Sequence, residues 1–478
     1  MKMIFVFIFL LLFASAVCMA ETQIPTIKIT GNWTVSVEGT FNVTGETVSI
    51  PKQTVKIARP TTITVTNEKY ENFGVFEPDR PFFAQGVPIK RVHNGETGMR
   101  LSLIPDSLVV KADPEGKVIY KLGKDYGLGA EWGFFGRLAN QKTEVDRSQG
   151  TAMLDETLIK KEESDLDTGV SAIKEGSTVY VDYKYILWRI DTIATDRNGK
   201  LFYFRGKPEI QMPKPPAVAK SYIPICNVFT RQFSEKVTED MLYPISATKL
   251  MPKKTKEPTI KTQLPRTYSK LTDKKEITIL FWGDSVTCGG SVSDVKKYVW
   301  QNVAARGIQA KYPNAKIRFE TTAWGGRGVG DFFSTPKGEQ YNFQEHVLDL
   351  NPDLVIMEFV NDTYQFITPQ MLKANYDKVK DIFAEKGIDW IILLPHFTDF
   401  DRESFGTEKY TADQRWYDKW VREEYANKYP NIAVADSSVL WGHLLYEGIP
   451  FCTLNKNGIN HPNDEGHQIL ADSVINIF

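Results

Sequence analysis

Residues 281–290 read Phe-Trp-Gly-Asp-Ser-Val-Thr-Cys-Gly-Gly and follow the apolar run Ile277–Leu280. Such a run predicts a buried strand, so Ser285 lies at its carboxyl end, where open α/β sheets bind their ligands. Gly283 and Gly289 supply the backbone freedom that a tight turn from strand to helix requires. The segment therefore indicates an α/β domain with a serine hydroxyl at the edge of its sheet.

Five apolar runs predict the strands of this domain, because a helix-length segment separates each run from the next. They span residues 277–282, 317–321, 353–359, 389–394 and 432–436. Thr368-Pro369 opens one helix as N-cap and first-turn proline, and Gly387 ends it. A second helix is expected near 411–428, with Trp416 and Trp420 on its buried side. The pattern predicts a sheet of five parallel strands.

Three further segments follow the serine in a fixed order. They read Trp324-Gly325-Gly326-Arg327, Val360-Asn361-Asp362 and Asn460-His461-Pro462-Asn463. Together with the Gly-Asp-Ser segment they resemble the four blocks of the SGNH, or GDSL-type, hydrolases. The resemblance covers residues 275–478 and implies a flavodoxin-like, three-layer α/β/α fold.

The resemblance also implies a role for each block. Ser285 would be the nucleophile and His461 the base. The backbone N–H groups of Ser285 and Gly326, with the side-chain amide of Asn361, would form the oxyanion hole. Chemistry supports these residue types, because a serine hydroxyl needs a base that titrates near neutrality. The oxyanion of the tetrahedral intermediate in turn needs preorganised N–H donors.

The histidine block departs from the family pattern. SGNH hydrolases usually carry an aspartate three residues before the histidine, where this chain has Gly458. If one extra residue is accommodated, Asn457 takes the place of the orienting carboxylate, and either its amide or a main-chain carbonyl orients His461. Two alternatives stay open. Another carboxylate, such as Asp464 or Asp436, reaches the histidine, or the domain no longer catalyses.

The remainder of the chain divides into three parts. Residues 1–20 combine Lys2 with an uncharged apolar run and small residues, which is typical of a secretory signal peptide. Residues 21–215 contain short β-branched and aromatic alternations with turn signals such as Asn198-Gly199. They predict an antiparallel β-rich accessory domain of one or two sandwiches. Residues 216–274 are expected to be a linker, because lysine and proline are frequent there.

Composition narrows the class of protein. The chain has 478 residues, a net charge of −1 and 42% hydrophobic residues, so it is globular with ample core. We expect no nucleic-acid partner, because there is no basic excess. Beyond the signal peptide no apolar run is long enough to span a membrane. With no cofactor motif and with six poorly spaced histidines, we expect neither a cofactor nor a metal.

The resemblance and the signal peptide together imply a periplasmic or extracellular carbohydrate esterase that removes acyl groups, usually acetyl. Arg327 and His396 would lie near the carboxyl edge of the sheet, where an acylated sugar could contact them. In the alternative interpretation, Arg327 pairs with Asp331 or Asp362, and His396 is a core residue. Two other functions stay open: a lipase or phospholipid-directed esterase of the same superfamily, and a carbohydrate-binding protein with impaired catalysis. Three roles stay open for the β-rich region: binding a polysaccharide, contributing loops to the active site, or serving only as structural support, which is the default expectation.

Overall fold

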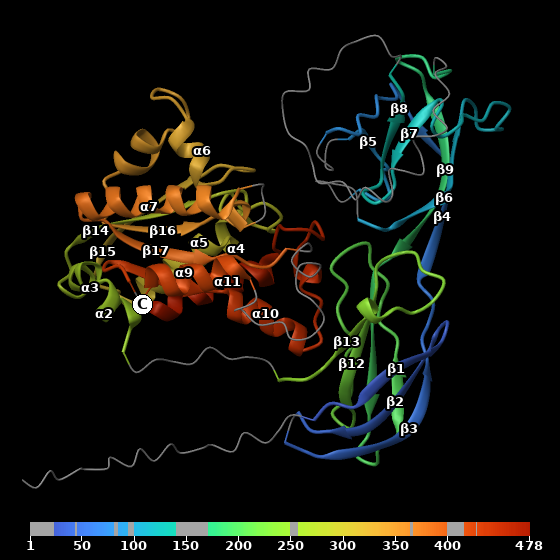
Figure 1. Ribbon diagram of the computed structural model, residues 1–478, viewed down its shortest axis with the longest axis horizontal. Helices are drawn as coiled ribbons and strands as arrows, with labels where there is room; N and C mark the ends of the chain where they lie inside the picture. The colour runs from blue at the N-terminus through green and yellow to red at the C-terminus, as the bar shows by residue number, and fades with distance from the viewer. Residues whose placement is uncertain are drawn as a thin grey trace, which may run out of the picture.

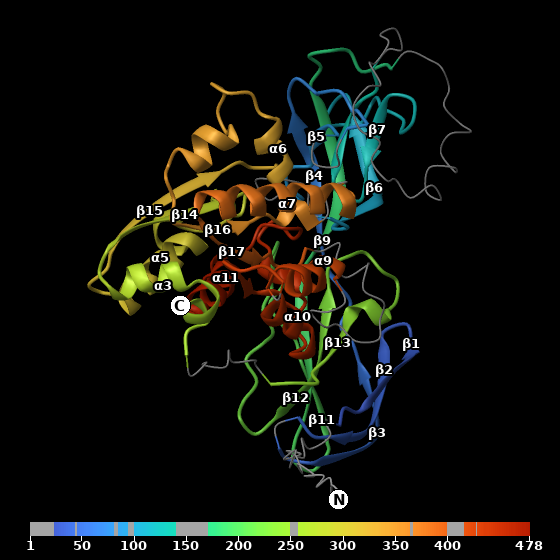
Figure 2. The ribbon, with the colours of Figure 1, turned by 60° about the vertical axis from the view of Figure 1, so that its left-hand side comes forward.

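The computed structural model describes residues 23–43, 45–80, 85–93, 100–139, 171–248, 257–363, 367–398, 415–426 and 428–478. The expected signal peptide lies outside these residues. The described chain forms an antiparallel β region and a C-terminal α/β domain, which Figures 1 and 2 show from two sides. Among the helices built from these residues, none has the length and hydropathy needed to cross a bilayer.

The α/β domain is built on one sheet of five parallel strands, in the order β15-β14-β16-β17-β18. Their bounds are Glu276–Gly283 for β14, Lys316–Ala323 for β15, Leu354–Glu358 for β16, Asp389–Leu394 for β17 and Ile432–Asp436 for β18. The five predicted strands are confirmed, and the order is that of flavodoxin-like folds. All five carboxyl ends therefore meet at one edge of the sheet.

Helices cover both faces of this sheet and make the domain three layers thick (Figure 1). One face packs against α2 (Thr259–Gln263), α3 (Pro265–Thr272), α5 (Trp300–Lys311) and α11 (Asp464–Ile477). The other packs against α6 (Val329–Ser334), η4 (Gln344–Leu348), α7 (Pro369–Lys386), α9 (Trp416–Val421) and η6 (Arg422–Ala426). Shorter elements at the strand ends are α4 (Val295–Tyr298), η5 (Val360–Thr363), α10 (Ser438–Tyr446) and η7 (Phe451–Leu454).

The predicted helix after Thr368 is confirmed as α7. The Thr368 hydroxyl accepts the N–H of Met371 at 3.2 Å, and Gly387 ends the helix with a φ of +71°. The second predicted helix, near 411–428, corresponds to α9. Residues 411–414 of the predicted range lie outside the described chain. Trp420 is buried, but Trp416 is 41% exposed, so its expected burial is wrong. As the first residue of α9, Trp416 makes ring contacts with its helix neighbours Tyr417 and Trp420.

The β region consists of two parts. In the first, the sheet β1-β2-β3 packs on the sheet β11-β10-β12-β13 around Val35, Ile50 and Ile193. Its strands are β1 (Thr26–Gly31), β2 (Thr34–Phe41), β3 (Val48–Lys56), β10 (Arg189–Thr195), β11 (Leu201–Phe204), β12 (Ile223–Thr230) and β13 (Leu242–Pro244). The short 3-10 helix η3 (Glu239–Met241) directly precedes β13. Gly199, with a φ of +80°, closes the predicted hairpin between β10 and β11.

The second part joins the sheet β4-β9-β6 to the small sheet β5-β8-β7 around Tyr126, Phe135 and Val181. Its strands are β4 (Thr61–Tyr70), β5 (Val87–Pro88), β6 (Leu103–Lys111), β7 (Tyr126–Gly129), β8 (Phe134–Arg137) and β9 (Val179–Leu187). Trp188 connects β9 to β10 and so stands where the two parts of the β region meet.

The described part of residues 216–274, expected to be a linker, contains five secondary-structure elements: β12, η3, β13, α2 and α3. β12 and β13 complete a sheet of the β region, and α2 and α3 belong to the α/β domain. The high lysine and proline content concealed short apolar patterns that tertiary contacts bury, such as Ile225 and Val228, or Ile260 and Leu264. Between the two groups, residues 249–256 lie outside the described chain.

Candidate active site

Ser285 and His461 meet at the carboxyl edge of the parallel sheet, although 176 residues separate them in sequence. Ser285 follows β14 directly, and His461 lies between η7 and α11. The Ser285 hydroxyl oxygen is 2.9 Å from Nε2 of His461. Both side chains are partly exposed, so a substrate can reach them. This is the distance at which an imidazole can remove the proton of a hydroxyl.

The turn that carries Ser285 is tied to the strand beside it. The Asp284 carboxylate is fully buried and accepts the backbone N–H of Val286 at 3.0 Å and of Asn361 at 2.9 Å. A Cβ atom at Gly283 would lie 2.1 Å from the Thr287 hydroxyl and 2.5 Å from the carbonyl oxygen of Glu358, so only glycine fits there. The first and third blocks therefore form one rigid unit.

The glycine block runs alongside the serine. A Cβ atom at Gly325 would lie 3.7 Å from the Cβ of Ser285. Gly326 has a φ of +74° and open space around its Cβ position, so a substrate can approach its backbone. Within the described chain, the backbone N–H groups of Ser285 and Gly326 donate to no protein acceptor.

Asn361 joins the second and third blocks. It is 1% exposed, and its side-chain nitrogen donates to the carbonyl oxygen of Arg327 at 3.2 Å. Its backbone N–H is held by Asp284, as described above. These two bonds fix the amide between the serine turn and the glycine loop. Three of the four sequence blocks are thus linked by direct hydrogen bonds around one point of the sheet edge.

Three fully buried carboxyl groups lie behind this edge, and sequence reasoning had not assigned a role to any of them. Burial raises the pKa of Asp284 to about 6, an effect that the positive charge of His461 opposes. Burial also raises the pKa of Asp362 to about 8 and that of Glu358 well above its usual value. Of these three carboxyl groups, Asp284 directly precedes the serine, and a positive charge on His461 favours its ionised form.

Asn457 holds the backbone that leads to His461. Its side-chain oxygen accepts the N–H groups of Ile459 at 3.0 Å, Asn460 at 2.9 Å and His461 at 3.0 Å. Its side-chain nitrogen donates to the side-chain oxygen of Asn460 at 2.9 Å. The bond to His461 thus joins Asn457 to the main chain of the histidine. The turn it stabilises is one that asparagine side chains commonly form.

The two alternative carboxylates make other contacts. Asp464 accepts the backbone N–H of Ser293 at 2.8 Å and its hydroxyl at 2.5 Å, at the start of α11. Asp436, at the end of β18, forms an ion pair with Arg422 at 2.8 Å and accepts a hydrogen bond from the backbone N–H of Ser438. These contacts tie each carboxylate to a structural role at a helix or strand end.

Arg327 and His396 occupy different surroundings. Arg327 is half exposed, pairs with Asp331 at 3.6 Å and lies 5.1 Å above the ring of Trp324. His396 is completely buried, and its Nε2 lies 2.7 Å from the carbonyl oxygen of Asn460. Burial lowers the pKa of His396 well below its usual value, so the neutral imidazole donates this bond. Only Arg327 is placed where a substrate can reach it.

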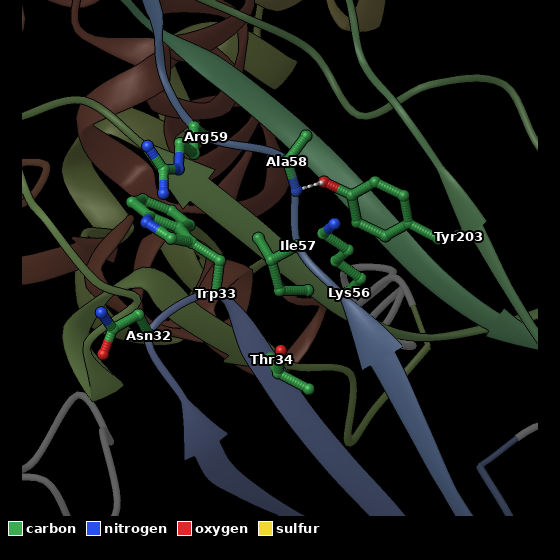
Figure 3. Close-up of a pocket in the computed structure, with 8 residues that line it drawn as sticks. All are labelled: Asn32, Trp33, Thr34, Lys56, Ile57, Ala58, Arg59 and Tyr203. Carbon is green, nitrogen blue, oxygen red and sulfur yellow. Dashed lines mark hydrogen bonds between the residues drawn. The ribbon is translucent and has the colours of Figure 1, made fainter.

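A pocket in the first part of the β region lies on other elements (Figure 3). It is lined by Asn32, Trp33, Thr34, Lys56, Ile57, Ala58, Arg59 and Tyr203. Its Tyr203 hydroxyl already accepts the N–H of Ala58 at 3.0 Å and donates to Asp191 at 2.5 Å. Trp33 is only 6% exposed. We assign no role to this pocket. In the described chain, no three His, Cys, Asp or Glu side chains gather as a metal site.

Two protein families match parts of the chain. The GDSL-like lipase/acylhydrolase family matches residues 281–469. A domain of unknown function, DUF4815, matches residues 149–251. No curated protein is similar enough to the chain to count as a match.

Solved structures similar to this chain include several esterases. A two-domain esterase active on acetylated mannans is 15% identical, with a TM-score of 0.35, over 44% of this chain and 51% of its own. The chain thus spans about half the length of that esterase. An acetylxylan esterase from Geobacillus stearothermophilus is 20% identical, with a TM-score of 0.32, over 41% of this chain and 91% of its own. A member of the lipolytic G-D-S-L family from Veillonella parvula is 20% identical, with a TM-score of 0.31, over 42% and 97%.

Proposed function

We propose that this protein is an exported serine esterase that removes acetyl groups from a carbohydrate, because residues 281–469 match the GDSL-like lipase/acylhydrolase family. The observation that carries the proposal is the 2.9 Å contact between the Ser285 hydroxyl and Nε2 of His461. Export rests on the sequence of residues 1–20.

In the first half of the reaction, the Ser285 oxygen attacks the ester carbonyl carbon while His461 Nε2 takes the hydroxyl proton. The carbonyl oxygen becomes an oxyanion, which the N–H groups of Ser285 and Gly326 and the amide of Asn361 stabilise. When the intermediate collapses, the bond to the sugar oxygen breaks and His461 returns its proton to that oxygen. The sugar leaves as an alcohol, and Ser285 keeps the acetyl group as an ester.

In the second half, water replaces the sugar. His461 takes a proton from the water, whose oxygen attacks the acetyl carbonyl carbon and re-forms the oxyanion. Collapse breaks the bond to Ser285, which recovers its proton from His461, and acetic acid leaves. Each proton taken by the histidine is thus given back within the same half-reaction.

Asp284 supplies the charge that this cycle needs. His461 is positive in both intermediates, and a nearby negative charge stabilises the imidazolium. The family usually has an aspartate three residues before the histidine, where this chain has Gly458. The buried Asp284, largely ionised at pH 7, is in electrostatic contact with His461. We infer that it takes over this part of the missing residue's work, while Asn457 holds the histidine backbone.

The surroundings of Ser285 support a small acyl group and a polar leaving group. Gly290 and Gly325 flank the serine, and a side chain at Gly290 would press against the His461 ring at 3.3 Å. Arg327, beside the oxyanion glycine, can donate to sugar hydroxyls, and the Trp324 ring beneath it offers an apolar face. A long acyl chain would require an apolar groove, whereas acetate requires only the space beside the serine.

The test is acetate release from a panel of acetylated glycans by the parent protein and by Ser285→Ala. We expect the parent to release acetate and to react with a fluorophosphonate probe, and the variant to do neither while melting at the same temperature. Equal activity in the two proteins would refute the proposal. A higher rate on decanoyl than on acetyl esters would indicate a lipase, and sugar binding without Ser285-dependent cleavage would indicate a binding protein.

A further inference from the structure

The β region packs directly on the segment that carries the histidine. This histidine segment, residues 455–463, runs from the end of η7 to the start of α11. In Figure 1 the red elements around α10 and α11 lie on the side of the α/β domain that faces the β region. Cys452, in η7 just before the segment, belongs to the apolar core of the second part of the β region.

Trp188 presses on the histidine segment at Gly458. A Cβ atom at Gly458 would lie 2.5 Å from Cη2 of Trp188, and the glycine has a φ of +74°, so no other residue fits there without strain. The indole itself is completely buried and fixed from the β region. Its N–H donates to the Ser102 hydroxyl at 2.9 Å, and its ring meets Phe229 edge-on at 5.6 Å.

Ile459 anchors the next position. It is 2% exposed and forms a separate apolar cluster with Trp132 and Phe134 of the β region. Its carbonyl oxygen accepts the side-chain nitrogen of Asn455 at 3.1 Å, so the residue is held on both its side chain and its backbone. Two consecutive residues, only two and three positions before His461, are therefore packed against aromatic rings from the other part of the protein.

Hydrogen bonds carry this packing to the histidine. One oxygen of Asn457 binds the N–H groups of Ile459, Asn460 and His461, so these residues move as a unit. From the opposite side, His396 of the α/β domain binds the Asn460 carbonyl oxygen at 2.7 Å. The turn thus has contacts with both the β region and the α/β domain, and the His461 ring extends from it to Ser285.

We propose that the β region is a working part of the active site, in which Trp188 and the Trp132–Phe134 pair are positioning residues that set His461 against Ser285. This inference rests on the proposed esterase function. It gives the β region a catalytic purpose, and it follows that the α/β domain alone would lack a correctly placed base. A misplacement of about 1 Å in a reacting group can cost about a hundredfold in rate.

The central test is Ile459→Ala with Ile50→Ala as matched control. Both isoleucines are 2% exposed and belong to apolar clusters, but Ile50 lies on β3 in the core of the first part of the β region, whereas Ile459 packs on Trp132 and Phe134. Both variants should lose similar stability. We expect kcat for acetyl ester cleavage to fall about tenfold or more in Ile459→Ala, with KM nearly unchanged, and to stay at the parent value in Ile50→Ala. Equal kcat in the two folded variants would overturn the proposal.

A rescue experiment tests Trp188 itself. Gly458→Ala should lower kcat, because its methyl group displaces the turn from the indole. Adding Trp188→Phe shortens the ring and opens space, so the double variant should recover part of the lost kcat. No recovery, in a protein whose melting temperature equals that of Gly458→Ala, would show that the contact with Trp188 does not position the histidine.

Hydrogen–deuterium exchange distinguishes a failure of the proposed positioning by the β region from a failure of the proposed function. We call the contacts of Trp188, Trp132 and Phe134 with residues 458–459 the clamp. The backbone N–H groups that Asn457 binds should exchange faster in Ile459→Ala than in the parent or in Ile50→Ala, whether or not the protein cleaves esters. Unchanged exchange would refute the clamp. If the parent shows no Ser285-dependent cleavage, the esterase proposal falls, while faster exchange would still support the clamp.

Discussion

The backbone N–H of Asn361 donates to the carboxylate of Asp284 at 2.9 Å, and this bond joins the segments that follow the neighbouring strands β16 and β14. The bond joins the residue before the serine to the asparagine whose side chain faces the glycine loop. A charged acceptor strengthens such a hydrogen bond, and complete burial protects it from water. Asp284 therefore positions both the serine turn and the backbone of Asn361, and a positive charge on His461 lowers the pKa of its carboxyl group against the effect of burial.

Asp284→Asn should lower kcat about tenfold or more, a loss of about 1.4 kcal/mol in transition-state stabilisation. The substitution removes the charge that stabilises protonated His461 and replaces one acceptor oxygen with a donor. Glu358→Gln is the matched control, because Glu358 is an equally buried carboxyl group behind the same sheet edge, burial raises its pKa well above the usual value, and glutamine has the same shape. The measurement is kcat on a small acetyl ester. Equal losses in both variants would contradict a role for charge.

Asn457→Ala should destabilise the protein by about 2 kcal/mol or more, because three N–H groups, one buried and two partly buried, lose their acceptor. It should also lower kcat, since the turn that carries His461 loosens. Asn457→Asp keeps the acceptor oxygen and should retain turnover close to that of the parent. Thermal unfolding and ester kinetics of both variants check this. A large gain in turnover with aspartate would instead favour an orienting contact between residue 457 and the histidine ring.

Asp362 should make the protein less stable as the pH rises. Its pKa is about 8 in the folded state, above the value of about 3.9 in an unfolded chain, so the folded state binds the proton more tightly. The free energy of unfolding therefore falls between about pH 4 and pH 8, by up to about 1.4 kcal/mol per pH unit from this group. Denaturant titrations should show a flatter pH dependence in Asp362→Asn, and the same slope in both proteins would contradict this prediction.

Arg327→Ala should weaken binding of an acetylated glycan while leaving cleavage of a small aryl acetate unchanged. The side chain is half exposed beside the oxyanion glycine, and losing one hydrogen bond to a sugar costs about 1 kcal/mol, or about fivefold in KM. The control is Arg318→Ala, on the outer strand β15. Equal KM values for the glycan in the parent and in Arg327→Ala would remove Arg327 from the substrate site.

Local patterns predicted the α/β domain well, because a strand buried on both faces leaves a continuous apolar run. The helix after Thr368 was equally clear, since its cap, first-turn proline and terminal glycine are all local signals. The strands at Ile223 and Leu242 were missed, because β-sheet formation depends on distant partners more than on local propensity. The buried carboxyls had one available signal: Glu358 and Asp362 flank a strand end that is otherwise apolar.

The sequence alone determined where the five strands of the α/β domain lie along the chain and which residues follow them, because apolar runs and turn residues are local features. Only the tertiary structure decided that His461 lies 2.9 Å from Ser285, that Asp284 is the buried charge beside it, and that Trp188 presses on Gly458. These are contacts between segments far apart in sequence. They depend on how whole layers pack, and no short stretch of residues encodes that packing.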